Sequence, residues 1–94
     1  MLESAIEKRL TRRVKDKGGL CLKWAASGTA GVPDRIILLP GGRVIFAELK
    51  QAGMDLRELQ KYRREQLENL GFEVWALRGT DELEAFFREV LDGV

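Results

Sequence analysis

The sequence has no histidine and a single cysteine, Cys21, among its 94 residues. The lack of histidine excludes catalysis by Ser–His and Cys–His pairs, and it also argues against a zinc site. Cys21 lies in an apolar stretch, which is typical of a buried strand thiol in a reducing compartment rather than of a nucleophile. Any hydrolytic chemistry must therefore come from carboxylates, lysine and metal-bound water, and we expect an intracellular location.

Long apolar runs are also lacking. No such run reaches the roughly 18 residues that a membrane span requires. The first residues, 1–4, are acidic and lack the apolar segment of a secretory signal. The length fits one domain, residues 1–94, and so short a chain buries only a modest fraction of its surface. We therefore expect a homo-oligomer that has no membrane partner.

The net charge is only +1, but its distribution is uneven. Residues 1–50 carry ten Lys and Arg against five Asp and Glu, whereas residues 51–94 carry six against ten. A basic first half suits a surface that binds phosphate. Solvated charged helices would produce the same asymmetry, so charge alone barely favours a nucleic-acid partner.

The hydrophobic pattern predicts a mixed α/β fold. Apolar residues recur every four positions in the first segment, which indicates an amphipathic helix, and short apolar runs bounded by Gly and Pro indicate strands. The expected elements are a helix over 2–17, strands over 20–26, 35–39 and 43–50, a helix from Asp55 to Leu70, a strand over 72–77 and a helix from Thr80 through Val90.

The second predicted helix has an irregular apolar stripe. Asp55 is expected to be its N-cap, with Glu58 completing a capping pair. Arg63 falls in the middle of the stripe formed by Leu56, Leu59, Leu67 and Leu70. An arginine at that place must extend to water, pair with a carboxylate or face a polar surface such as a partner chain.

Two acidic motifs flank a predicted hairpin. Asp34 precedes the strand over 35–39, Pro40-Gly41-Gly42 forms a tight turn, and Glu48 and Lys50 close the returning strand. Alternation places Glu48 and Lys50 on the same face, and strand pairing can bring Asp34 close to Glu48. Two carboxylates and an ammonium group at one end of a sheet suit a hard divalent cation and a phosphodiester. Each residue alone is more often an ordinary turn acid or a solvated strand end.

The ordered set of these motifs resembles the VRR-NUC family of the PD-(D/E)XK nuclease superfamily. The residues that carry the resemblance are Glu7 in the first helix, Gly31-Val32-Pro33-Asp34, Glu48-Leu49-Lys50, Gln60 in the second helix and the run 71–75. The resemblance implies an α+β fold with a mixed sheet and the order α-β-β-β-α-β plus a C-terminal helix. The whole chain would then be a single nuclease domain.

The resemblance also implies a catalytic set. Asp34, Glu48 and the backbone carbonyl of Leu49 would bind Mg²⁺, for which Mn²⁺ could substitute, and no small-molecule cofactor is expected. Lys50 would orient the attacking water or offset developing charge. Glu7 would contact a second metal or a metal-bound water, and Gln60 would hold a water or a phosphate. Both Glu7 and Gln60 could instead be polar flanks of their helices.

Several further residues are candidate DNA contacts. The small-residue loop with Ser27 and Gly28 could approach a phosphate, although it could also be an ordinary connector. Lys23 interrupts an apolar run and could reach phosphate or lie on an exposed face. The first helix adds Arg9, Arg12 and Arg13, a basic surface that could hold the DNA backbone or be merely solvated.

The resemblance points to a metal-dependent, structure-specific endonuclease acting on branched DNA. Short stand-alone members resemble phage homodimers that resolve Holliday junctions in DNA repair, inside a bacterial host. A twofold axis would place two identical sites on two equivalent strands. The alternatives are a nuclease of the same chemistry acting on flaps, ends or single strands, and a non-catalytic module that binds nucleic acid.

Overall fold

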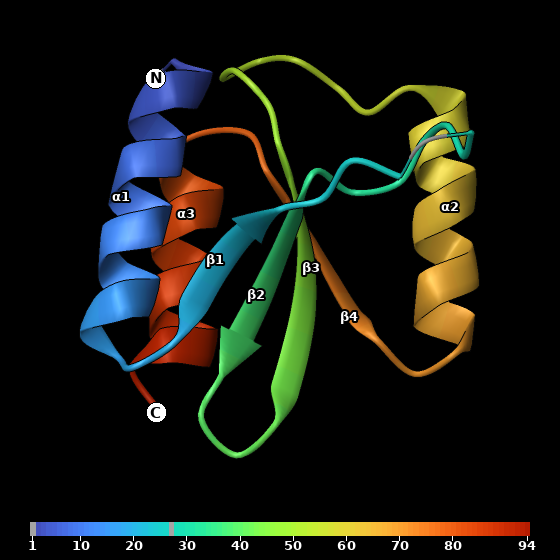
Figure 1. The fold of residues 1–94 in the computed structure, drawn as a ribbon. Helices are drawn as coiled ribbons and strands as arrows, with labels where there is room; N and C mark the ends of the chain where they lie inside the picture. Colours follow the sequence, from blue (N-terminus) through green and yellow to red (C-terminus); the bar gives the residue numbers. More distant parts are fainter. Residues whose placement is uncertain (1, 27) are drawn as a thin grey trace.

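The computed structural model describes residues 2–26 and 28–94 as one four-stranded sheet with helices on both sides (Figure 1). The predicted element order and the mixed α+β class are both confirmed. The elements are α1 (Glu3–Asp16), β1 (Leu20–Lys23), β2 (Arg35–Leu39), β3 (Arg43–Leu49), α2 (Glu58–Asn69), β4 (Glu73–Leu77), α3 (Thr80–Phe86) and a π-helical continuation, η1 (Phe87–Leu91).

The strands lie in the order β1-β2-β3-β4. The pairs β1–β2 and β2–β3 are antiparallel, and β3–β4 is parallel. A tight turn joins β2 to β3, and Gly41 and Gly42 adopt φ values of 85° and 81° there, a left-handed conformation that favours glycine. The parallel pair needs a crossover, which α2 provides. Asp34 and Glu48 therefore lie at the same end of the sheet, away from the turn.

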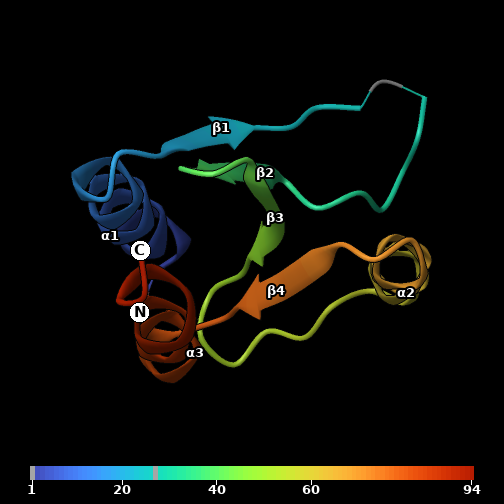
Figure 2. The same cartoon turned by 90° about the horizontal axis from the view of Figure 1, so that it is seen from below.

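The core lies between the sheet and the pair α1 and α3, which cover one face together (Figures 1 and 2). Ile6, Leu10 and Val14 of α1 are fully buried, as their spacing predicts. Ile37 and Leu39 supply this face from β2. None of the described helices is long and apolar enough to cross a membrane.

The second helix begins later than predicted, and its N-cap is Arg57 rather than Asp55. The Asp55 carboxylate accepts a hydrogen bond from the next residue, the Leu56 N–H, at 2.8 Å and pairs with Arg78 at 2.9 Å. It is therefore engaged before the helix starts. Gln60 caps the helix instead, since its Oε1 accepts the Arg57 N–H at 2.8 Å.

The leucine stripe of this helix does not form a core face. Leu59 is 44% exposed and Leu70 is 73% exposed, while Gln60 is the residue of α2 that is buried. Figure 2 shows why, because α2 lies on the side of the sheet opposite α1 and α3 and near β4, so it does not extend across the other strands. Arg63 donates to the Ala30 carbonyl at 3.2 Å, so it ties α2 to the loop that precedes β2.

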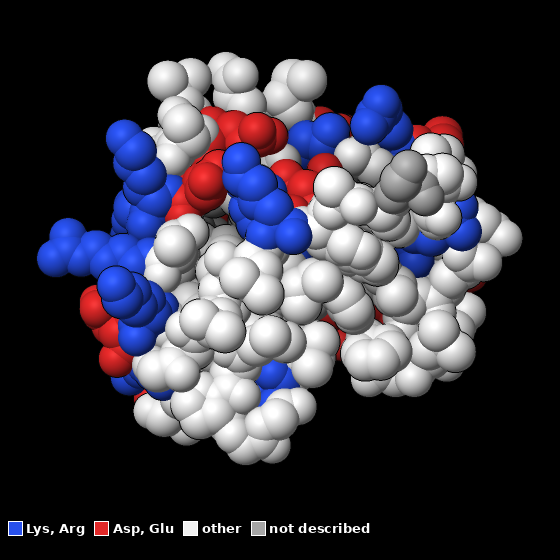
Figure 3. All heavy atoms as spheres, viewed as in Figure 1, with Lys and Arg blue, Asp and Glu red and all other residues white. Residues whose placement is uncertain are grey.

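The sheet face on the α2 side stays largely open. Leu20 and Leu22 of β1 and Phe72 before β4 are exposed apolar side chains. Figure 3 shows a wide uncharged surface over the sheet, with acidic and basic side chains gathered above it. On the face that Figure 3 shows, charged side chains thus gather at the end of the sheet away from the hairpin turn and along α1.

Candidate active site

Asp34 and Glu48 exchange contacts through the backbone. The Asp34 N–H donates to Glu48 Oε2 at 3.1 Å, and the Leu49 N–H donates to Asp34 Oδ1 at 3.1 Å. The register explains this arrangement, because Arg35 pairs with Ala47 and the next residues on each strand lie just beyond that last pair. The Leu49 peptide therefore lies beside both carboxyl groups, while its side chain is buried in the core.

The Glu48 side chain lies in a buried environment that disfavours its ionised form. Only 8% of the residue is exposed. Burial, followed by the nearby Asp34 charge, raises the pKa of Glu48 to about 7. Lys50 and the Asp34 N–H oppose this rise by favouring the ionised form. Near neutral pH the metal-free site therefore contains Glu48 in both protonation states.

Gln60 fixes the second oxygen of Glu48. Its side-chain Nε2 donates to Glu48 Oε1 at 2.9 Å, and its Oε1 accepts the Arg57 N–H. The capping bond therefore sets which end of the amide faces Glu48. This arrangement gives Gln60 a definite role in orienting Glu48 from α2.

Glu7 approaches the same end of the sheet from α1. Its Oε2 accepts a hydrogen bond from Arg35 NH2 at 2.6 Å. Arg35 NH1 lies 3.3 Å from Asp34 Oδ2, so the guanidinium connects Glu7 to Asp34. Glu7 and Gln60 thus reach the site from opposite faces of the sheet.

Arg35 was not among the predicted site residues. The signal was present, because period-two alternation places Arg35 on the same buried face as Ile37 and Leu39. A cation on a buried face requires a carboxylate partner, and Glu7 and Asp34 are the partners. Alternation alone could not identify them.

Lys50 follows directly after β3. Its backbone N–H donates to the Leu77 carbonyl at 3.1 Å, which continues the pairing with β4. Its charge favours ionised Glu48, so the ammonium group lies close enough to act on that carboxylate. The site therefore combines the carboxyl groups of Glu7, Asp34 and Glu48 with the cations Arg35 and Lys50.

This donor set fits a hard divalent cation. In the described part of the chain, no group of three or more Asp, Glu or Cys side chains is arranged to hold a metal. The site offers the Asp34 and Glu48 carboxylates beside the Leu49 peptide. Mg²⁺ takes oxygen ligands, keeps several waters and usually needs only one or two protein carboxylates. The residues present therefore match magnesium better than a metal that needs a full protein cage.

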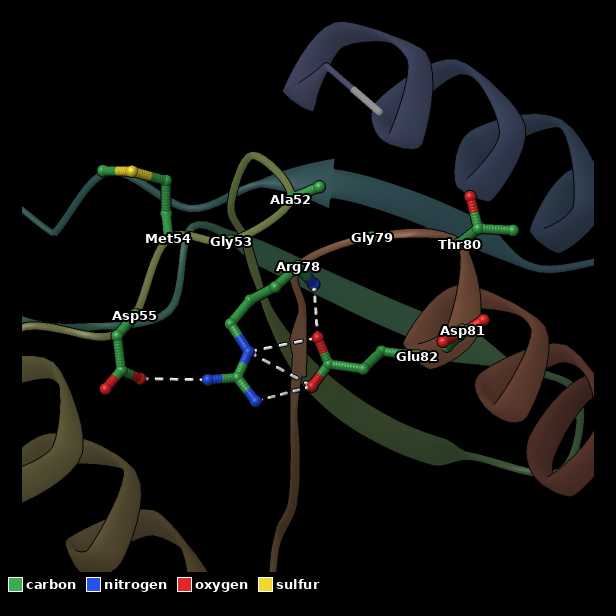
Figure 4. A pocket seen from close by; sticks show the side chains of 9 residues that line it. All are labelled: Ala52, Gly53, Met54, Asp55, Arg78, Gly79, Thr80, Asp81 and Glu82. Atoms are coloured by element: carbon green, nitrogen blue, oxygen red, sulfur yellow. Dashed lines mark hydrogen bonds and ion pairs between the residues drawn. The ribbon is translucent and has the colours of Figure 1, made fainter.

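An open groove of about 570 Å³ lies beside the loop after β3 (Figure 4). Arg78 contacts Glu82 at 2.9 Å and Asp55 at 2.9 Å, so it bridges the start of α3 and the loop that leads to α2. Both acids hold the guanidinium in place. The bridge connects the loop before α2 to the start of α3.

The described residues predicted to contact DNA fall into two groups, those already in ion pairs and those exposed to solvent. Arg9 pairs with Glu84, and Arg13 pairs with Asp92 at 3.1 Å and lies over the Phe87 ring, so both contact the C-terminal helical segment. Phosphate would have to compete with these ion pairs. Arg12 and Lys23 are exposed, as is Gly28, which has φ +80° and open space around it. Ser27 lies outside the described residues.

Comparison with known proteins shows strong similarities in sequence and in structure, whereas no protein-family model matches the chain. The chain is 38% identical over 79 residues to "Putative nuclease p44" of Acyrthosiphon pisum secondary endosymbiont phage 1. The aligned region covers 84% of this chain and 85% of the phage protein. A solved structure described as "VRR_NUC domain" superposes with a TM-score of 0.87 at 24% identity and covers 94% of this chain and 96% of its own. The chain therefore belongs to the same family as the phage protein and has the VRR-NUC fold that its motifs indicated.

Proposed function

We propose that this protein is a Mg²⁺-dependent endonuclease that hydrolyses phosphodiester bonds in branched DNA, with the four-way junction as its substrate and a homodimer as its active form. The observation that carries the proposal is the pairing of Asp34 with Glu48 beside Lys50, in a chain related to a phage nuclease. The phage relative also supports action inside a bacterial host.

The contacts of these residues support the proposed roles. Asp34, Glu48 and the Leu49 carbonyl bind the cation, and Gln60 keeps Glu48 oriented. Bound Mg²⁺ would supply a more acidic water and offset charge on the phosphoryl oxygens, and Mn²⁺ would substitute for it. Lys50 orients the attacking water or offsets negative charge as the phosphate reacts.

Glu7 is proposed to contact a second metal or a metal-bound water. Its carboxylate lies at the correct end of α1 for this role, but Oε2 is already engaged by Arg35. Glu7 therefore has its other oxygen, Oε1, for such a contact. The exposed cations Lys23 and Arg12 are the proposed phosphate contacts on the flanks.

The open apolar sheet face supports the homodimer. Exposed Leu20 and Leu22 lie on this face, and Phe72 adjoins it. Contiguous exposed apolar surface of this kind is characteristic of protein interfaces. A second copy of the chain, related by a twofold axis, is the proposed occupant, because it would also supply a second site for the equivalent strand of a junction. Light scattering of the wild type and of Leu22→Lys tests this, with a monomeric wild type as the contradicting result.

The activity test uses labelled four-way junction, flap, duplex and single-stranded DNA with Mg²⁺, Mn²⁺ or EDTA. Paired symmetric nicks on the junction, lost in EDTA, are the expected result. Metal-dependent cutting confined to the other substrates would replace the junction with flaps, ends or single strands. Binding without cutting would instead indicate a non-catalytic module.

A further inference from the structure

Arg35 is a buried cation for which the proposed chemistry has no use. Its side chain is 9% exposed, although it opens β2 directly after Asp34. Burying a guanidinium is costly unless carboxylates and hydrogen bonds compensate for the lost water. The location of those partners therefore indicates what the residue does.

The two arms of the guanidinium reach two different elements. NH2 donates to Glu7 Oε2 of α1 at 2.6 Å. NH1 donates to the Asp34 carbonyl at 3.0 Å and lies 3.3 Å from Asp34 Oδ2. Arg35 thus joins the first helix to the residue that begins the metal site.

Together with its other hydrogen bonds, these contacts immobilise the backbone and the carboxylate of Asp34. Its Oδ1 accepts the Leu49 N–H, its own N–H donates to Glu48, and its carbonyl also accepts the Trp24 N–H at 2.9 Å. Without Arg35, Oδ2 would lose the cation that holds it and the carboxylate could rotate. A planar fork can hold two carboxylates and a carbonyl at once, which a lysine ammonium, as a point charge, reproduces poorly.

We propose that Arg35 is a positioning residue that links Glu7 to Asp34 and thereby sets the affinity of the site for a divalent cation. This inference rests on the proposed function, since it concerns the cation of that same site. It assigns Glu7 an action on Asp34 through Arg35. This positioning effect differs from the electrostatic effect of Arg35, whose positive charge on its own would repel a metal ion.

The two effects predict opposite changes in metal affinity. If Arg35 positions Asp34, Arg35→Met weakens Mn²⁺ binding about 10-fold or more, the range seen when residues that support metal ligands are altered. Arg35→Lys, which retains the charge but not the fork, also weakens it. If only charge matters, Arg35→Met tightens binding and Arg35→Lys leaves it unchanged, and either result overturns the proposal.

Calorimetry with Mn²⁺ alone, without DNA, measures these affinities. The matched control is Arg43→Met, which removes an exposed arginine paired with Glu73 at 2.7 Å at the far end of the hairpin. This control is expected to bind Mn²⁺ as the wild type does. Thermal melts establish that each variant is folded, and the partly exposed Glu7→Gln provides a milder variant that retains Arg35.

A double-mutant cycle tests the link itself. If Glu7 acts on Asp34 through Arg35, Glu7→Gln weakens Mn²⁺ binding by a smaller factor in the Arg35→Met background than in the wild type, and the loss that remains reports a direct contact of Glu7 with a metal or its water. Fully additive losses would overturn the link.

A metal-free readout separates this proposal from the proposed function. In amide NMR spectra, Arg35→Met should shift the Leu49 N–H signal and accelerate its exchange with solvent, because that N–H donates to Asp34 Oδ1. A wild type that binds no Mn²⁺ would contradict the metal-dependent function. An unchanged Leu49 amide in Arg35→Met would contradict the positioning role.

Discussion

The Asp34 backbone N–H donates to Glu48 Oε2 at 3.1 Å, so the first carboxylate residue of the site directly orients the second. Because the two carboxylates are close, their negative charges repel each other. Burial and the Asp34 charge together raise the pKa of Glu48 to about 7. One contact thus aligns the pair, while their closeness leaves Glu48 with an affinity for protons near neutral pH.

Metal binding should depend on pH through Glu48. A cation needs the ionised carboxylate, so binding below pH 7 must displace a proton, and the affinity should rise by up to about tenfold per pH unit there before levelling off. Calorimetry with Mg²⁺ at pH 6 and pH 8, in buffers of different ionisation enthalpy, measures both the affinity and the proton release. Equal affinities at the two pH values would contradict the prediction.

The stability of the metal-free protein should fall as Glu48 ionises. The pKa of Glu48 is raised from 4.5 to about 7 on folding, so its contribution is fully present below pH 4.5 and is lost as pH rises through 7. Urea unfolding at pH 5 and pH 8 should show a smaller loss for Glu48→Gln than for the wild type. An identical pH dependence in both proteins would be evidence against the raised pKa.

Removing the Asp34 charge should lower the pKa of Glu48, because that charge is the second cause of the rise. In Asp34→Asn, ¹³C NMR titration of the Glu48 carboxyl carbon should give a midpoint below that of the wild type. The exposed substitution Asp16→Asn is the matched control and should leave the midpoint in place. An unaltered midpoint in Asp34→Asn would show that burial alone accounts for the shift.

Cleavage should depend on the three charged residues of the site. Asp34→Asn, Glu48→Gln and Lys50→Ala are each expected to lower the single-turnover cleavage rate by about 100-fold or more, while folding and much of the DNA binding are retained. Gel-shift and cleavage assays on the same junction measure both properties. The exposed variants Asp16→Asn and Lys15→Ala serve as controls. Unchanged cleavage by any one active-site variant would remove that residue from the mechanism.

Gly31 should tolerate no side chain. It has φ +83°, and a Cβ there would lie 2.7 Å from the Leu59 carbonyl oxygen, whereas Gly28 has φ +80° with nothing within 4 Å. Gly28→Ala should therefore cost about 1 kcal/mol of strain, and Gly31→Ala about 2–4 kcal/mol, because backbone must also move. Urea unfolding of both variants measures the difference. Equal losses would show that the close approach to α2 contributes nothing.

The hairpin shows how far local pattern can predict this structure. The strand 35–39 has the bounds expected from its apolar run, and the Pro40-Gly41-Gly42 turn brings Asp34 back to Glu48. A tight turn fixes which residues of its two strands pair, so the sequence separation of Asp34 and Glu48 from the turn is enough to place them side by side. For the same reason, the candidate metal site could be located from its motifs.

The second helix shows where the same reasoning fails. Its leucine spacing correctly indicated a helix, but it did not reveal that Leu59 and Leu70 are exposed and that the polar Gln60 is buried. Helical periodicity reports which side chains share a face, and it does not report whether another element covers that face. Asp55 failed as a cap because Leu56 and Arg78 engage its carboxylate.

The sequence by itself determined the element order, the hairpin and the family motifs, because these depend on periodicity, turn residues and short separations along the chain. Only the tertiary structure decided that Arg35 bridges Glu7 and Asp34 and that Gln60 orients Glu48. Those contacts join residues from α1, the sheet and α2. Their geometry depends on how helices on opposite faces pack against one sheet end, and no local pattern encodes that packing.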